Sequence, residues 1–322
     1  PFAFNRLVSA DATSYALFGQ VTYTPPILDN RLDITVGARF TRDEREATRA
    51  YDDNFFTTTL DNGSNDETYT RFNPALTLAY QFSDDLNGYA KVATGYKAGG
   101  SSEATPVFAD TFDPENVINY ELGLKSYLWD RRVRANFAVF YTKVSDLQMS
   151  FPVSSTNPSI VAAINAGNSH IKGFEADILV QPIDDLSLSF EYTGLIGEID
   201  KVHPEGDTIY SDAGYDGNIA SFFSTSYTPR HKLTTAVDYT FLRWGSSDLS
   251  THIEYRYTSR YWATQPTGSS VPGREFYQQN SYGLTDARIN LNLDEHWRFG
   301  VWGKNIFNKE YTSFVIGNGS PI

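Results

Sequence analysis

Hydrophobic and polar residues alternate along most of the chain, most clearly in the stretch 72–99. There, Leu76, Leu78, Tyr80 and Phe82 are separated by smaller or more polar residues. Successive side chains of a strand point to opposite faces, so this period of two predicts a strand with one apolar face. A short segment of Ser and Asp follows, and a second alternating run returns. The stretch therefore predicts a β-hairpin with one apolar and one polar face.

The same unit recurs along the chain at intervals of roughly fifty residues. Each unit consists of a strand, a short turn, a second strand and a long polar loop. Besides the hairpin, strands are expected at 11–24, 31–42, 120–128, 132–143, 173–181, 186–192, 230–242, 249–259, 282–293 and 297–311. Long loops are expected at about 43–68, 98–117, 197–229 and 260–280, and another runs through Pro152 and Pro158. This alternation of loop lengths is typical of outer-membrane barrels, which have short periplasmic turns and long extracellular loops.

Strand length separates a membrane barrel from a soluble β protein, which is the alternative. Strands of soluble proteins run about five or six residues, whereas these run about ten or more, as tilted membrane-crossing strands require. No stretch approaches the roughly 18 consecutive apolar residues of a transmembrane helix. The pattern predicts an all-β fold, a transmembrane antiparallel up-and-down β-barrel, of which this chain supplies about 12 strands.

Composition narrows the classes of function. The chain has no cysteine, which excludes disulfide frameworks, cysteine metal sites and thiol catalysis. Its net charge of -13 disfavours nucleic-acid binding. The GxSxG, Walker and HExxH motifs are absent, so we predict no enzyme, no catalytic residue and no cofactor. The acidic stretch 61–67 could hold Ca²⁺, but such residues are also what turns are made of, and we predict no metal site.

Two of the expected long loops carry aromatic residues and arginines suited to ligand recognition. Aromatic rings stack on sugars, catechols and other rings, while arginine binds carboxylate or phosphate. Anchoring at the membrane interface or packing between loops is the alternative role. The candidates are Tyr210, Tyr215, Phe222 and Phe223 in one loop, and Arg260, Tyr261, Trp262, Arg274 and Tyr277 in the other.

Three stretches, in this order and spacing, resemble a known family. They are YAKVATGYKAGG (89–100) followed by PENVINYELGLKS (114–126), then NAGNSHIKGFEADI (165–178), and finally NIFNKEY (305–311). Together they resemble the C-terminal barrel of TonB-dependent outer-membrane receptors, over nearly the whole chain. The resemblance implies a 22-strand barrel that encloses an N-terminal plug domain and draws energy from the inner-membrane TonB complex. The chain starts at Pro1 and stops at Ile322. We therefore expect residues 1–322 to be the C-terminal part of the barrel, without the plug and the final strand.

The resemblance also implies a location, partners and a function. The location would be the outer membrane of a Gram-negative bacterium. The partners would be the TonB complex (through the plug), outer-membrane lipid and lipopolysaccharide, and a small-molecule ligand such as a ferric siderophore, with no nucleic acid. The function would be active uptake of a scarce nutrient, and vitamin B12, haem, oligosaccharides and aromatic plant compounds remain open as cargo. A passive porin or sugar channel, or a glycan-binding β protein, is the alternative.

Charged residues on the polar faces of the strands would point into the barrel. They could contact substrate or plug, but pairing within the wall is favoured, because a polar interior is general in such barrels. These residues are Glu121, Lys125, Arg134, Glu175, Asp177, Asp238, Glu254, Arg256, Asp286, Arg288 and Lys304.

Overall fold

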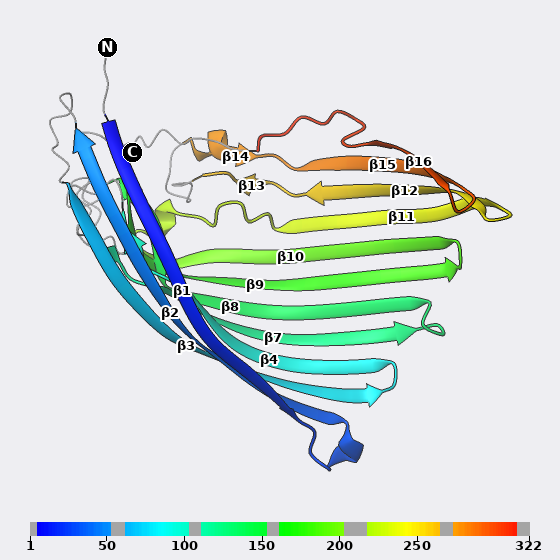
Figure 1. Ribbon diagram of the computed structural model, residues 1–322, viewed down its shortest axis with the longest axis horizontal. Helices are drawn as coiled ribbons and strands as arrows, with labels where there is room; N and C mark the ends of the chain where they lie inside the picture. The colour runs from blue at the N-terminus through cyan, green and yellow to red at the C-terminus, as the bar shows by residue number, and fades with distance from the viewer. Residues whose placement is uncertain are drawn as a thin grey trace.

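The computed structural model describes residues 5–52, 62–102, 111–152, 161–202, 218–264 and 273–313, and shows one strongly curved antiparallel sheet of 12 strands (Figure 1). Its strands are β1 (Asn5–Tyr23), β2 (Leu32–Asp52), β3 (Gly63–Ser83), β4 (Leu86–Lys97), β7 (Glu115–Leu128), β8 (Val133–Pro152), β9 (Val161–Ile183), β10 (Leu186–Val202), β11 (His231–Trp244), β12 (Ser247–Thr258), β15 (Tyr282–Leu293) and β16 (Trp297–Gly303). Smaller elements are β5 (Gly100–Ser101) with β6 (Thr111–Phe112), β13 (Tyr261–Trp262) with β14 (Gln278–Gln279), and the 3-10 turns η1 (Leu28–Asn30), η2 (Ala220–Phe222) and η3 (Arg274–Tyr277).

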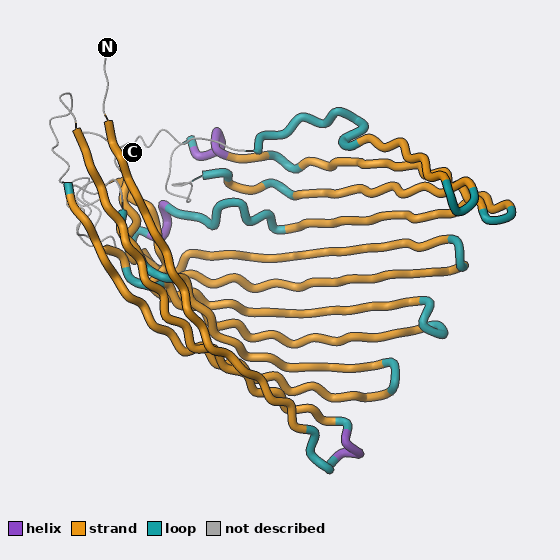
Figure 2. Tube along the Cα trace, in the orientation of Figure 1, coloured by secondary structure: helices purple, strands orange, loops and turns teal. Residues whose placement is uncertain are grey.

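Each long strand pairs with its neighbours in sequence, so the sheet is an up-and-down meander with β1 and β16 at its open edges. Figure 2 shows the short turns gathered at one end of the sheet. At that end the backbone turns sharply, with positive φ at Trp129, Asp130 and Arg131 and at Gly245. The connections at the opposite end, which we call the long-loop end, are longer. The predicted antiparallel strand pairs and the asymmetry of the connections are confirmed.

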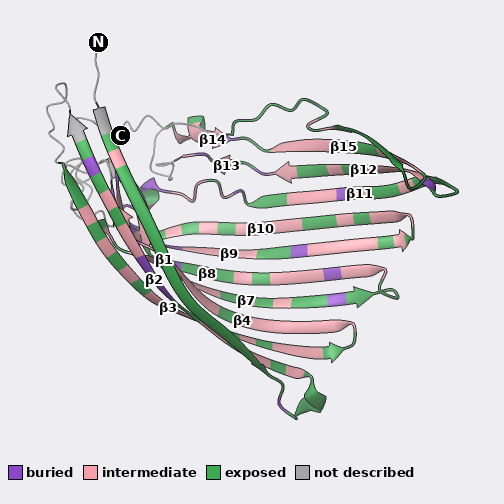
Figure 3. Ribbon diagram, viewed as in Figure 1, coloured by how far each residue is buried: buried purple, intermediate pink, exposed green. Residues whose placement is uncertain are grey.

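Large apolar side chains are exposed on many strands, and Figure 3 shows exposed residues recurring along the strands of the sheet. The strand register places these side chains on one face. One row across this face runs over four successive strands. In it, Leu78 lies opposite Ala90, Ala90 opposite Leu122, and Leu122 opposite Val139. Soluble monomers rarely expose so large an apolar surface, whereas a barrel wall presents one to lipid. We call these outward apolar side chains the apolar belt and the opposite face the inner face. Among the described residues, no helix is both long and apolar enough to cross a membrane.

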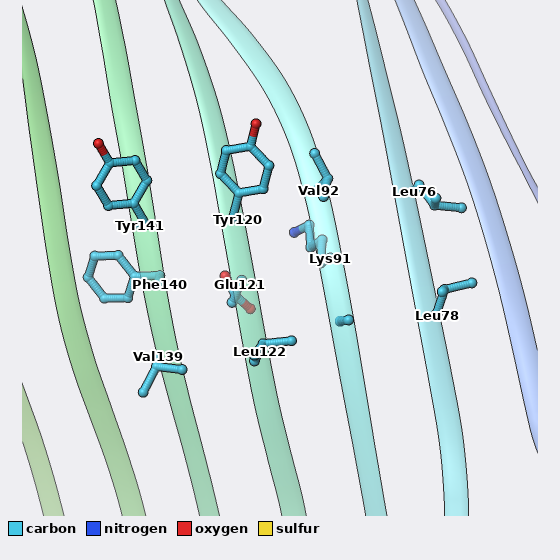
Figure 4. Close-up of a pocket in the computed structure, with 11 residues that line it drawn as sticks. Leu76, Leu78, Lys91, Val92, Tyr120, Glu121, Leu122, Val139, Phe140 and Tyr141 are labelled. Atoms are coloured by element: carbon cyan, nitrogen blue, oxygen red, sulfur yellow. The ribbon is translucent and has the colours of Figure 1, made fainter.

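The belt contains a shallow depression of about 500 Å³ (Figure 4). Tyr120 and Tyr141 lie in one row of its lining, and Leu122 and Val139 lie in the next. Lys91 and Glu121, which also border it, belong to the inner face by their register. Because the depression faces lipid, we do not assign it to a water-soluble ligand.

Several strands extend further toward the long-loop end than the sequence pattern predicts. Most of the expected loop 43–68 is strand, since β2 runs to Asp52 and β3 starts at Gly63. Likewise β9 begins at Val161 rather than at 173. Above the belt the paired ends of β2 and β3 are polar on both faces, so hydrophobic alternation ends there while backbone pairing continues. Within the described part of the acidic stretch, residues 62–67 lie mostly in β3, and no group of described residues could hold a metal ion.

The last predicted strand, 297–311, is shorter than expected, because β16 ends at Gly303. The side chain of Asn305 accepts a hydrogen bond from the backbone N–H of Lys309 at 2.8 Å and donates one to the Lys309 carbonyl at 3.0 Å. Asn305 itself has a positive φ of 47°. This local turn takes the hydrogen bonds that a ladder would need, as Asn side chains often do.

A small hydrophobic cluster lies at the long-loop end of β8, β9 and β10. We call it the cap cluster, and it consists of Met149, Ala166, Val202, Ile219, Phe222 and Phe223. Residues 218–223, in the connection after β10, lie against the end of that strand, where the Ile219 N–H donates to the Val202 carbonyl at 3.0 Å. The Val202 N–H donates to the side chain of Asn218, also at 3.0 Å. The cluster therefore holds residues 218–223, which lie within an expected long loop, against the end of β10.

Candidate functional site

The candidate site is a polar cavity of about 690 Å³ at the long-loop end of β10–β12. Four of the residues predicted from the sequence border it, namely Arg260, Tyr261, Trp262 and Arg274. It is also bordered by Arg230, His231, Ser259, Glu275 and Gln278, among others.

A short two-stranded ladder holds the aromatic and basic side chains of this cavity together. β13 pairs with β14, which sets Trp262 opposite Gln278. The Ala263 N–H donates to the Tyr277 carbonyl at 2.9 Å, closing the ladder onto η3. As a result, the guanidinium carbon of Arg274 lies 5.0 Å from the centre of the Trp262 ring, a cation–π contact. Tyr277 thus supports the ladder through its backbone and is not among the residues that border the cavity.

Two further tyrosines, Tyr227 and Tyr282, lie next to Tyr261, which borders the cavity. The Tyr227 ring lies 5.7 Å from the Tyr261 ring, and the Tyr227 N–H donates to the Trp262 carbonyl at 2.8 Å. Burial and then the neighbouring Tyr282 raise the pKa of the Tyr261 hydroxyl above its ordinary value. An ordinary tyrosine hydroxyl is already neutral at neutral pH, so the shift extends the neutral form to higher pH.

The charge of the cavity favours an anionic, ring-bearing ligand. Within the described part of the chain, Arg230, Arg260 and Arg274 form no ion pair, and the one acidic residue that borders the cavity is Glu275. Arginines bind carboxylates and phosphates through two parallel hydrogen bonds. Aromatic faces add contact area and stacking.

The second predicted loop cluster does not border this cavity. Phe222 and Phe223 are only 3% and 7% exposed, because they pack in the cap cluster. In this structure the two rings pack inside the protein. Packing was the alternative to ligand recognition for the aromatic residues of the loops. Tyr210 and Tyr215 lie outside the described residues.

Most predicted inner-face charges contact neighbours on the same strand or on an adjacent strand. Arg256 lies 3.0 Å from Glu254 and 2.7 Å from Asp286. Arg134 lies 3.1 Å from Asp177. These contacts fit the favoured interpretation, in which the charges pair within a wet wall.

The remaining charges of this set have polar or aromatic neighbours. Glu121 accepts a hydrogen bond from the Tyr89 hydroxyl at 2.7 Å, and Lys125 lies 5.6 Å from the centre of the same ring. Glu175 and Lys125 border a cavity of about 290 Å³ on the inner face. Asp238 pairs with His252 at 2.7 Å, and Arg288 donates to Asn290 at 2.6 Å. Lys304 follows directly after β16.

Arg230, His231 and Gln278 were not predicted as site residues. The basic run RHK at 230–232, placed where a long loop meets a strand, is the signal that points to the first two. No sequence pattern points to Gln278, whose position depends on the pairing of β13 with β14.

A long-stranded meander with an apolar outer belt, a polar inner face and elaborate connections at one end defines an outer-membrane β-barrel. The family described as "TonB dependent receptor-like, beta-barrel" matches residues 3–306, and the chain belongs to this family. The predicted membrane barrel is confirmed by this match. The chain is accordingly an outer-membrane protein of a Gram-negative bacterium, with its short turns periplasmic and its long-loop end extracellular.

The chain is similar to several uptake receptors. The ferric-pyoverdine M114 receptor PbuA of Pseudomonas sp. (strain M114) is 26% identical over 249 residues, covering 76% of this chain and 27% of that protein. The pesticin receptor of Yersinia pestis is 26% identical over 321 residues, covering 96% of this chain and 41% of that protein. The crystal structure of the ferric yersiniabactin uptake receptor FyuA from Yersinia pestis matches with a TM-score of 0.74 at 20% identity, covering 98% of this chain and 44% of that one. The chain thus spans less than half the length of each of these proteins.

Proposed function

We propose that the whole protein is a TonB-dependent active transporter that imports a ferric siderophore or a similar iron complex. In this proposal residues 1–322 are the C-terminal part of a 22-strand barrel, and a plug domain elsewhere in the protein contacts the TonB complex. The single observation that carries the choice of ligand is the cavity at the extracellular end. It combines three arginines with Tyr261 and Trp262, in a chain whose relatives include a ferric-pyoverdine receptor.

The chemistry of the cavity suits such a ligand. Iron chelates carry carboxylate, catecholate or similar anionic oxygens, often on rings. The guanidinium groups of Arg260 and Arg274 would bind the oxygens, while the Trp262 ring would stack on the ligand. Lipid and lipopolysaccharide would surround the apolar belt, outside the path of the ligand.

Binding is tested with the full-length receptor in detergent, using the ferric complexes of pyoverdine, yersiniabactin and a catecholate as probes. We expect one complex to bind. We also expect Arg274→Gln to weaken its binding about 10- to 100-fold, because a charge-assisted hydrogen bond contributes roughly 1.5–3 kcal/mol. Trp262→Ala should also weaken binding, because it removes the stacked ring and its buried area. The matched control is Arg243→Gln, since Arg243 pairs with Asp185 at 2.6 Å at the periplasmic end. Unchanged affinity in both site variants would exclude the cavity as the binding site.

Transport is tested by uptake of the bound complex, labelled with radioactive iron, in cells with and without the TonB-contact segment. Active transport requires that deleting the segment abolishes uptake while leaving binding intact. Uptake that persists would refute TonB dependence and would favour a passive porin, which also conducts ions at rest in planar bilayers.

A further inference from the structure

Two cavities lie one above the other on the outer side of β3, β4, β7 and β8. The lower one is the depression of about 500 Å³ in the apolar belt. The upper one has a volume of about 290 Å³ and is bordered by Pro74, Thr94, Asn116, Ile118, Lys143 and Ser145, among others. Successive outward rows of the sheet border first the depression and then the upper cavity, toward the long-loop end. We call the two cavities together the outer groove.

The upper cavity lies where β3 and β4 separate. Their paired register ends at Ala75 and Ala93, although both strands continue toward the long-loop end. The next residue of β3, Pro74, has no backbone N–H to donate to a ladder. In place of a backbone pair, the Thr94 hydroxyl donates to the Pro74 carbonyl at 3.1 Å. The interrupted ladder therefore leaves the wall hollowed directly above the belt.

The lower part of the groove is apolar and faces lipid. The short side chain of Ala90 lies between Leu78 and Leu122 in one row and leaves space there. Tyr120 and Tyr141 form the next row, and their hydroxyl groups point away from the row below (Figure 4). Tyrosine rings are typical of the level at which hydrocarbon meets polar headgroups. The groove therefore offers room for a hydrocarbon chain below the tyrosines and for a polar group above them.

Lys143 supplies a cation to the upper part of the groove. It follows Tyr141 by two residues on β8, so the two side chains share the outer face. Lys143 is exposed, and it forms no ion pair with the residues that the structure describes. Among the described residues that border the upper cavity, none is acidic, and the other basic one, Arg71, belongs to the inner face by its register.

The acidic residues nearest to Lys143 contact other groups. In the same row, His170 lies between Lys143 and Glu198, and its Nε2 atom is 3.8 Å from the Glu198 carboxylate. Asp146, three residues further along β8, accepts a hydrogen bond from the side chain of Asn116 at 3.0 Å. The ammonium group of Lys143 is therefore available to an anion that arrives with a ligand.

We propose that the outer groove binds one phospholipid molecule, with an acyl chain in the depression and the phosphate group at Lys143. The Ser145 hydroxyl, which borders the same cavity, adds a hydrogen-bond donor for the headgroup. A lipid with a single phosphate is assigned because Lys143 is the one outward cation that borders the groove in the described part of the chain. A free phosphate would leave the apolar depression unused. The site rests on the membrane barrel and does not depend on iron, on the TonB complex or on transport.

Native mass spectrometry of the full-length receptor counts the lipid molecules bound after detergent release. The probe is dioleoyl phosphatidylglycerol, with dioleoyl glycerol, which lacks the phosphate, and glycerol phosphate, which lacks the chains, as truncated probes. We expect one phosphatidylglycerol to bind at least about tenfold more tightly than either truncated probe. Equal binding of dioleoyl glycerol, or a preference for lipid A with its two phosphates, would overturn the assignment.

A first pair of variants tests the phosphate contact. Lys143→Gln should weaken phosphatidylglycerol binding at least about tenfold, because it removes a charge-assisted hydrogen bond. Arg42→Gln is the matched control, since Arg42 also faces outward but contacts Glu44 at 2.8 Å and does not border the groove. Its affinity should change less than about twofold. Equal losses in the two variants would show that the phosphate does not lie at Lys143.

A second pair tests the position of the acyl chain. Ala90→Phe fills the depression and should weaken binding at least about tenfold by excluding part of the chain. Ala287→Phe is the control, because Ala287 lies opposite Ile253 in the belt, away from the groove, and its affinity should change less than about twofold. Both variants add the same apolar ring on the lipid side. Undiminished binding in Ala90→Phe would contradict the proposed location, whereas lipid binding without iron uptake would leave this site supported and the proposed transport function refuted.

Discussion

Replacing Phe222 by alanine will lower the stability of the cap cluster by about 3–5 kcal/mol, the usual cost of truncating a buried phenylalanine. The ring is 3% exposed and packs with Phe223, Val202 and Met149. The cluster is small and stands above the membrane, so a loss of this size is enough to open it locally while the lipid-embedded strands stay paired.

Hydrogen exchange of backbone amides measures this effect segment by segment in the folded protein. We expect faster exchange at residues 218–223 and at the extracellular ends of β9 and β10, with no change near the periplasmic turns. Phe276→Ala is the control, because Phe276 is 87% exposed and its loss should change stability by less than about 0.5 kcal/mol. If the two variants exchange alike, the packing role of Phe222 is wrong.

Replacing Val139 by arginine will destabilise the folded barrel by about 2–4 kcal/mol, the cost of a lipid-facing arginine near the bilayer midplane. Val139 is 48% exposed and belongs to the apolar belt. It lies between Leu122 on β7 and Phe174 on β9. A charge at this position has no partner in hydrocarbon and no water nearby. The free energy of unfolding in lipid vesicles, measured by denaturant titration, gives the size of the loss.

Asn136→Arg is the matched substitution on the inner face of the same strand. Asn136 donates to Asp177 at 3.2 Å and borders a polar cavity. An arginine there stays in contact with water and a carboxylate, so we expect a change of less than about 1 kcal/mol. Equal costs for the two variants would show that the inner and outer faces of β8 are assigned wrongly.

The extent of the strands was only partly predictable. Inside the membrane, the solvent differs on the two sides of the wall, so residues such as Leu122 and Glu121 must alternate in polarity. Above the membrane, water covers both sides, and a paired strand can be polar throughout. The segment from Asp43 to Arg49 therefore has the composition of a loop, although its backbone is paired with both β1 and β3.

The binding residues were predictable by type but not by place. Trp262 and Arg274 are candidates from their chemistry alone, but their contact depends on the pairing of β13 with β14. Phe222 has equally suitable chemistry, yet it is buried where the chain folds back onto β10. Ala90 and Lys143 are far apart in sequence and border one groove through the register of β4, β7 and β8. Arg45 and Arg71, likewise far apart, share the inner face through the register of β2 and β3.

The all-β class, the order of strand pairs and the polarity of each strand face follow from the sequence alone, because each depends on residues two apart or on adjacent hairpins. The three-dimensional packing was needed to show which loop side chains border the cavity, which are buried in the cap cluster, and which arginines share the inner wall. Those outcomes depend on strand register and on packing between segments that are distant in sequence. Many arrangements of these segments satisfy the same local pattern of polarity, and contacts across the sheet select one of them.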